Sequence, residues 1–146
     1  MKNLFLFACF LLLAACSKTE SPASLDSASK QAIAQTNASV IADLYAKKRS
    51  QVWVEDNGIV LKVLADDVNG ARHQRFLVKV GTNQTLLFVH NIDLAARVEN
   101  IKLGDHIAFS GEYIYNPKGG IIHWTHHDPQ GKHKAGWIKL NGKIYE

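Results

Sequence analysis

The chain has 146 residues, of which 47% are hydrophobic and 21% are charged, and its formal net charge is +4 at pH 7. This length predicts a single domain, and the apolar share is large enough for a hydrophobic core. The positive charge is too small to indicate a nucleic-acid-binding protein by itself. Both cysteines, Cys9 and Cys16, lie near the N-terminus. The rest of the chain therefore has no thiol for a disulfide or a cysteine metal site.

Residues 1–15 predict a signal peptide. A positive start is followed by an apolar run from Leu4 to Ala15, which is shorter than the about 20 residues of a membrane span and fits a secretory leader. The run ends in Leu-Ala-Ala-Cys16, which resembles the lipobox of bacterial lipoproteins. That resemblance implies cleavage before Cys16 and lipidation of its thiol, which would anchor the protein to a membrane. Because Ser17 rather than an aspartate follows, it also implies the periplasmic side of the outer membrane. A plain signal peptide or a short anchor is the alternative.

Two segments separate this leader from the main domain. Residues 16–25 are rich in Ser, Thr, Lys, Glu, Pro and Ala and predict a disordered tether. Residues 26–49 predict an amphipathic helix, because Ile33, Val40, Ile41, Leu44 and Tyr45 recur at spacings of three, four and seven. We expect this stripe to pack on the domain that follows it rather than on a partner.

From residue 50 onward, apolar and polar residues alternate, which predicts β-strands. Within residues 72–80, Gln74, Phe76, Val78 and Val80 are expected on one face and His73, Arg75 and Lys79 on the other. The expected strands cover residues 51–65 (one strand, or two bent at Asn57-Gly58), 72–80, 85–90, a fourth after Leu103-Gly104-Asp105, and 121–126. A short helix is expected at residues 92–98. Asn141-Gly142 predicts a tight hairpin between residues 137–140 and 143–145.

This order of elements predicts the fold class. Five strands with a short helix between the third and the fourth are typical of an OB-fold barrel. We therefore expect residues 50–146 to form a mainly β, OB-fold-like, five-stranded barrel preceded by the N-terminal helix. The stretch Gly104–Tyr113 also resembles the fourth strand of many OB domains. Another small barrel or an open β-meander is the alternative.

Several unusual strings occur in order between about Ser50 and Tyr145. They include His90-Asn91-Ile92-Asp93-Leu94-Ala95, Asn116-Pro117-Lys118-Gly119-Gly120 and Ile122-His123-Trp124-Thr125-His126-His127-Asp128-Pro129. Together they resemble an uncharacterised bacterial family of small exported proteins of unknown function. The resemblance implies no activity, ligand or cofactor.

The histidines are the main candidates for catalysis or metal binding. His90, His123, His126 and His127 are the candidate catalytic residues, and His73, His90, His123 and Asp128 are the candidate metal ligands, with zinc as the candidate ion. On one continuous strand, His123 and His127 would lie about 13 Å apart, so a metal site would need a break at His126 or a ligand from another strand. The alternative is that His90 and His123 are structural, with ring nitrogens that bond backbone groups or carboxylates.

A binding surface is the competing interpretation. OB domains bind oligonucleotides and sugars on their second and third strands and the adjacent loops. The matching residues here are Arg72, His73, Arg75, Lys79, Tyr115, Asn116, Lys118 and Trp124. The favoured hypothesis is a monomeric, lipid-anchored envelope protein that binds an oligonucleotide, a glycan or an envelope protein and requires no cofactor. The alternatives are a histidine-dependent, metal-assisted hydrolase of phosphodiester or similar bonds, and a structural or assembly lipoprotein.

Overall fold

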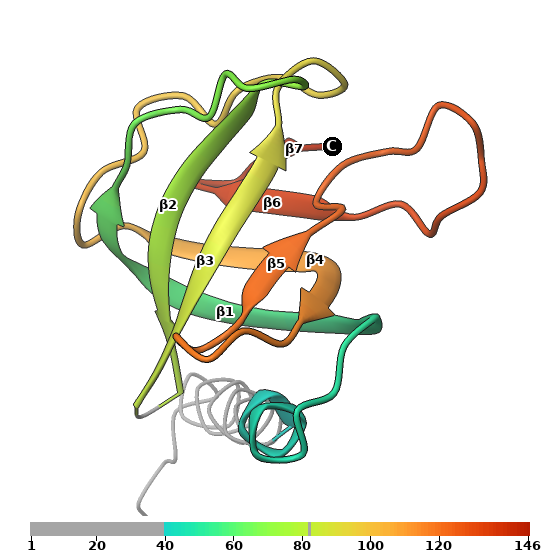
Figure 1. The fold of residues 1–146 in the computed structure, drawn as a ribbon. Coiled ribbons are helices and arrows are strands. Elements are labelled where there is room, and N and C mark those ends of the chain that lie inside the picture. The colour runs from blue at the N-terminus through green and yellow to red at the C-terminus, as the bar shows by residue number, and fades with distance from the viewer. Residues whose placement is uncertain (1–39, 82) are drawn as a thin grey trace, which may run out of the picture.

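The computed structural model describes residues 40–81 and 83–146 (Figure 1). They form a helix at residues 40–46 and seven strands. The strands are β1 (Val52–Val63), β2 (His73–Val80), β3 (Gln84–Asn91), β4 (His106–Ile114), β5 (Ile121–His123), β6 (Trp137–Leu140) and β7 (Lys143–Tyr145). The first expected strand is thus continuous, and the expected hairpin of the last two strands is confirmed.

Five of the strands close into a barrel. Around it, β1 pairs with β2, β2 with β3, β3 with β5, β5 with β4, and β4 with β1. Only the β3–β5 pair is parallel. The inward residues of β2 follow the expected alternation, since Gln74, Phe76, Val78 and Val80 are all buried. Phe76 stacks on Phe88 at 5.1 Å between ring centroids, and both belong to the fully buried core.

The fifth strand of the barrel is split into two pieces. One edge of β4 pairs first with β5, from Ile121 to His123, and then with β6, from Trp137 to Leu140. Between them, residues 124–136 leave the barrel as a projecting loop (Figure 1). The expected strand over residues 121–126 is therefore wrong beyond His123. The backbone turns there because Trp124 takes a left-handed conformation with φ of 52°.

The short helix expected at residues 92–98 is also absent, because residues 92–95 form turns and residues 96–98 are irregular. Side chains of β2 and β3 bond the backbone groups that a helix would use. The Gln74 side chain bonds both the N–H and the carbonyl of Val98 at 2.8 and 3.0 Å, and His90 bonds the Ala96 carbonyl at 3.1 Å. The segment consequently keeps a non-helical conformation, and the Val98 side chain is buried.

The helix at residues 40–46 closes the end of the barrel at which β2 turns into β3 (Figure 1). It buries Ile41 and Leu44 in the core, and Tyr45 donates a hydrogen bond to the Pro117 carbonyl at 3.0 Å. The expectation that the apolar stripe packs on its own domain is confirmed for these residues. The predicted leader, the tether, Cys16 and the first part of the predicted helix, residues 26–39, lie outside the described residues. No helix within the described ranges is long and apolar enough to cross a membrane.

Candidate functional site

Aromatic rings gather where the loop of residues 124–136 leaves the barrel. His133 stacks on Trp124 with 3.9 Å between centroids, and His126 and His123 lie 5.3 and 5.6 Å from it. His73 lies 5.9 Å from His123, and His90 lies 6.3 Å from His126. We call Trp124 and these five histidines the imidazole cluster. All of its members except His133 were candidates from the sequence, because His133 lies in a polar stretch with no periodic pattern.

His90 is the most deeply buried member of the cluster, with no exposed surface. Its Nε2 lies 3.1 Å from the Ala96 carbonyl, which only accepts hydrogen bonds, so Nε2 carries the proton. Its Nδ1 must then accept a hydrogen bond from the Thr125 hydroxyl at 2.9 Å. Burial lowers the pKa of His90 to about 4. Neutral His90 therefore joins β3, the 92–98 segment and the projecting loop, and it has no nitrogen free for catalysis or a metal.

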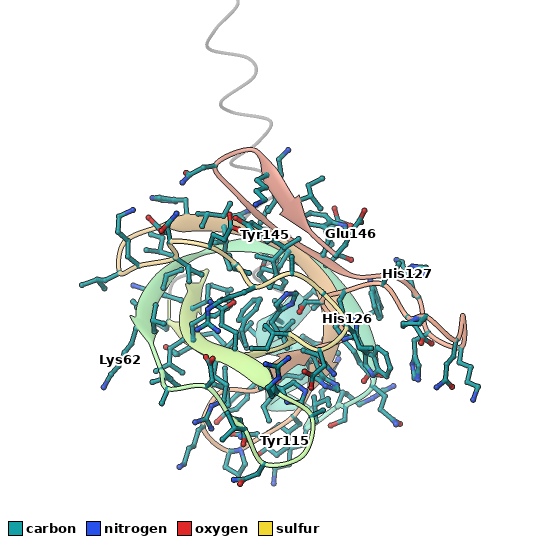
Figure 2. The ribbon with its side chains drawn as sticks, turned by 90° about the horizontal axis from the view of Figure 1, so that it is seen from above. Lys62, Tyr115, His126, His127, Tyr145 and Glu146 are labelled. Atoms are coloured by element: carbon teal, nitrogen blue, oxygen red, sulfur yellow. The ribbon has the colours of Figure 1, made fainter. Side chains whose placement is uncertain are left out.

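The other histidines differ in their surroundings. His126 is 1% exposed, and its Nδ1–H donates to the His127 carbonyl at 2.8 Å. His123 has a lowered pKa, first because of burial and then because of neighbouring imidazoles, with His73 foremost. His127 is exposed. Figure 2 shows His126 close to the barrel and His127 further out along the loop. Three of the four candidate catalytic histidines, His90, His123 and His126, thus belong to the imidazole cluster, and His127 does not.

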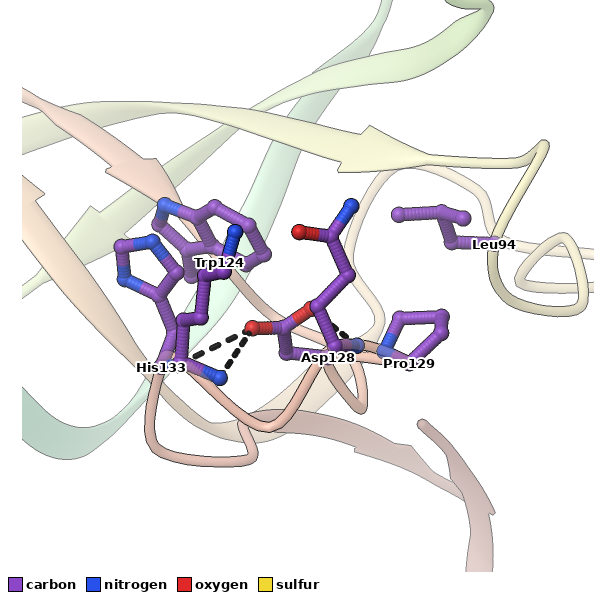
Figure 3. A pocket seen from close by; sticks show the side chains of 7 residues that line it. Leu94, Trp124, Asp128, Pro129 and His133 are labelled. Carbon is purple, nitrogen blue, oxygen red and sulfur yellow. Dashed lines mark hydrogen bonds between the residues drawn. The ribbon is translucent and has the colours of Figure 1, made fainter.

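Asp128 organises the loop from within. It is 5% exposed, and its carboxylate accepts hydrogen bonds from the backbone N–H groups of Gln130, Lys132 and His133 at 2.8 to 3.0 Å (Figure 3). These bonds hold the pKa of Asp128 below its usual range. Its oxygens are therefore engaged inside the loop. Across residues 40–81 and 83–146, no three His, Cys, Asp or Glu side chains are arranged to hold a metal ion.

A small cleft opens at the base of this loop, with a volume of about 210 Å³ (Figure 3). It is lined by Leu94, Trp124, Asp128, Pro129, Gln130, Lys132 and His133. Figure 3 shows Trp124 and Leu94 on opposite sides of the cleft. Only Trp124 and Asp128 of this set were candidates from the sequence, because the cleft depends on the 92–98 segment and the loop meeting in space.

The candidate ligand-binding residues fall at two ends of the barrel. His73 and Trp124 belong to the imidazole cluster, and Arg72 and Arg75 flank His73 in the chain. Lys79, Tyr115, Asn116 and Lys118 lie near the opposite end of β2, which is about 23 Å away along the strand. There, Tyr115 packs on Tyr45 at 5.6 Å between ring centroids, and the Asn116 side chain accepts a hydrogen bond from the Lys118 N–H at 2.6 Å.

The two arginines near the cluster are already partnered. Arg72 forms an ion pair with Asp93 at 2.6 Å, and the Arg72 backbone N–H also bonds that carboxylate. Arg75 donates to the Ala65 carbonyl at 3.0 Å and lies 4.0 Å from Asp67. Their guanidinium groups are therefore less available to a phosphate backbone than the sequence alone indicated.

A different feature occupies the middle of the outer face. Leu77 on β2 is opposite Leu87 on β3, and Leu87 is beside Ile121 on β5. Val89 points the same way as Leu87, and all four side chains are half-buried. We call these four residues the aliphatic strip. In Figure 1 the strip face of β2, β3 and β5 is turned toward the viewer, and no other described element covers it. No local sequence pattern indicates the strip, because its members lie on three strands.

Residues 24–146 match the sequence model of a family described as "Protein of unknown function (DUF3465)". Because this match covers most of the chain, the protein belongs to that family, and the expected membership of an uncharacterised family is confirmed. No curated protein sequence is similar enough to the chain to count as a match.

Proposed function

We propose that this DUF3465 member is a lipid-anchored protein of the cell envelope that binds a polypeptide partner on the outer face of an OB-fold-like barrel. A closed five-stranded barrel is the basis for the OB assignment, although the usual helix between the third and fourth strands is replaced by an open segment. The lipid anchor would be Cys16, and Ser17 after it favours the periplasmic side of the outer membrane as the place of the barrel. The role is binding rather than turnover.

The aliphatic strip is the observation that supports this proposal. Leu77, Leu87, Val89 and Ile121 form one contiguous apolar surface across three strands. An apolar patch with a polar border is typical of a surface that another protein covers. Each square ångström of apolar surface removed from water contributes about 25 cal/mol, so a partner that covers the strip gains affinity from these four side chains.

The same face offers little to the other ligands considered from the sequence. Binding of single-stranded nucleic acid relies on aromatic platforms and free cations. The outward positions in the middle of β2 and β3 are aliphatic, and Arg72 and Arg75 are bonded to carboxylates or a carbonyl. A histidine-dependent hydrolase has less support, because both nitrogens of His90 are engaged in a buried network. A role in envelope assembly is one form of the proposed polypeptide binding.

A pair of matched cross-linking sites tests the proposal. A photoreactive amino acid is placed at Leu87, in the strip, and in a second strain at Leu103, an aliphatic residue that is 71% exposed on the loop before β4. We expect one defined envelope protein to be captured from position 87 and not from position 103. That protein, once purified, should bind the domain about tenfold more weakly after Leu87→Gln, and with unchanged affinity after Leu103→Gln. Equal capture from both positions, or equal affinity of both variants, refutes the proposal.

The anchor is tested separately. Cys16→Ser should move the protein from the membrane fraction to the soluble periplasmic fraction, while the barrel keeps its circular dichroism spectrum. A variant that remains in the membrane fraction contradicts lipid anchoring at Cys16 without affecting the assignment of the strip.

A further inference from the structure

The cleft at the base of the projecting loop lies apart from the aliphatic strip and has a chemistry of its own. Trp124, Leu94 and Pro129 form apolar walls, and Gln130 contributes an amide that can both donate and accept hydrogen bonds. A volume of about 210 Å³ is below the about 300–1,000 Å³ of pockets that hold drug-sized molecules. The cleft therefore matches one ring with an apolar face and polar substituents.

The exposed charges of the loop of residues 124–136 have one sign. Its exposed ionisable side chains are all basic: His127, Lys132, His133 and Lys134. Asp128 is its one acidic residue, and the carboxylate of Asp128 is bonded to three backbone N–H groups. The ammonium group of Lys134 lies over the Trp53 ring at 5.4 Å. Lys132 lines the cleft, and none of the ion pairs among residues 40–81 and 83–146 involves it. Lys132 is therefore the cation that remains for a bound anion.

Hydrogen bonds within the protein hold the loop in shape. The Thr125–His90 hydrogen bond fixes the start of the loop, and the Asp128 carboxylate holds its middle. Where the loop returns to the barrel, the Gly136 N–H donates a hydrogen bond to the His126 carbonyl at 3.1 Å. Trp124 itself adopts a left-handed backbone conformation with φ of 52°, which bulky residues seldom adopt outside functional or strained sites. A site that is formed in advance loses less conformational entropy when it binds.

From these observations we propose that the cleft is a second binding site, separate from the strip, for an anionic saccharide: a sugar ring that carries a carboxylate or a phosphate. The apolar face of the ring packs on Trp124 and Leu94, and Gln130 bonds its hydroxyl groups. The anionic group pairs with the Lys132 ammonium, beside the imidazole of His133. Uronic acids and phosphorylated sugars share this chemistry, and a direct comparison distinguishes them.

The test uses the full-length ¹⁵N-labelled protein in detergent micelles and follows the indole N–H signal of Trp124 by NMR. The indole signals of Trp53 and Trp137 in the same spectrum serve as internal controls. The probes are glucuronate, glucose 6-phosphate, glucose, inorganic phosphate and a tetraglutamate peptide. We expect glucuronate or glucose 6-phosphate to shift the Trp124 signal saturably, and whichever binds more tightly identifies the anionic group. Glucose and inorganic phosphate should each bind about tenfold more weakly, because each lacks one of the two recognised features.

Two variants make the assignment specific. Lys132→Gln removes the ammonium group but keeps the backbone N–H that bonds Asp128, and it should weaken binding of the anionic sugar about tenfold. Lys139→Gln makes the same change at an exposed position on β6 and should leave the affinity unchanged. The inference is overturned if glucose binds as well as the anionic sugars, if tetraglutamate binds more tightly than either, if no probe moves the Trp124 signal, or if Lys132→Gln has no effect. Leu87→Gln should keep saccharide binding, so failure of this inference is distinguishable from failure of the strip proposal.

Discussion

Replacement of His90 by glutamine should remove much of the sensitivity of the fold to mild acid. In the native protein, the His90 Nε2–H donates to Ala96 and its Nδ1 accepts from Thr125, inside a site with no exposed surface. A proton added to Nδ1 forces the Thr125 hydroxyl to accept this hydrogen bond instead of donating it, and it places a charge in the core. A glutamine amide offers one donor and one acceptor at this site, but it does not titrate.

The size of the effect follows from proton linkage. Burial lowers the pKa of His90 from 6.5 to about 4 in the folded state. Between these two values the unfolded chain binds more protons than the folded chain, so the free energy of unfolding rises with pH. This contribution is complete above pH 6.5 and is lost as the pH falls toward 4. Between pH 7 and pH 4.5 the loss from His90 alone is about 2 kcal/mol.

Urea denaturation at pH 7 and pH 4.5, followed by tryptophan fluorescence, measures this loss. Other titrating groups contribute equally to both proteins, so the difference between the wild type and His90→Gln isolates residue 90. We expect the wild type to lose about 2 kcal/mol more than the variant over this interval. If both proteins lose the same free energy of unfolding, His90 is not held neutral by burial, and its assignment as the buried residue that joins β3, the 92–98 segment and the projecting loop is wrong.

Three further predictions concern the loop and the helix. Asp128→Asn should speed hydrogen exchange of the Lys132 and His133 amides, measured by NMR, while exchange in the β2–β3 ladder stays unchanged; slow exchange at both loop amides would show that the carboxylate does not organise the loop. Ile41→Ala should lower the free energy of unfolding by about 2–5 kcal/mol, because Ile41 is 1% exposed. The control variant Val40→Ala, at a residue that is 46% exposed, should change the free energy of unfolding by less than about 0.5 kcal/mol. Similar urea midpoints for the two variants would mean that the helix does not stabilise the barrel. Gly136→Ala should lower the melting temperature, because an added Cβ would collide with the carbonyl oxygens of Trp124 and Ser110. A melting temperature equal to that of the wild type would contradict this close approach of the backbone at Gly136.

Local patterns in the sequence were sufficient for much of the barrel. On β2, the alternation placed Gln74 and Phe76 inside and His73 and Arg75 outside, and the structure has them there. The Asn141-Gly142 turn and its two flanking strands were also predicted, and Asn141 and Gly142 both take the positive φ angles that such a turn requires. These features depend on side-chain alternation and turn chemistry within a few neighbouring residues, which is why sequence reasoning finds them.

Contacts between distant segments decided the rest. The expected helix at 92–98 does not form because Gln74 on β2 and His90 on β3 bond its backbone groups. The fifth strand breaks at Trp124, where the close approach of the chain at Gly136 lets a loop leave the barrel.

The candidate sites have the same origin. The imidazole cluster brings together histidines from two strands, the end of a third and the loop, and the aliphatic strip joins leucines and an isoleucine from β2, β3 and β5. The sequence alone determined which residues alternate along the strands, the tight turn at Asn141-Gly142 and the family to which the chain belongs. Only the tertiary structure determined which of those residues meet, because pairing between strands places side chains together that no local periodicity relates.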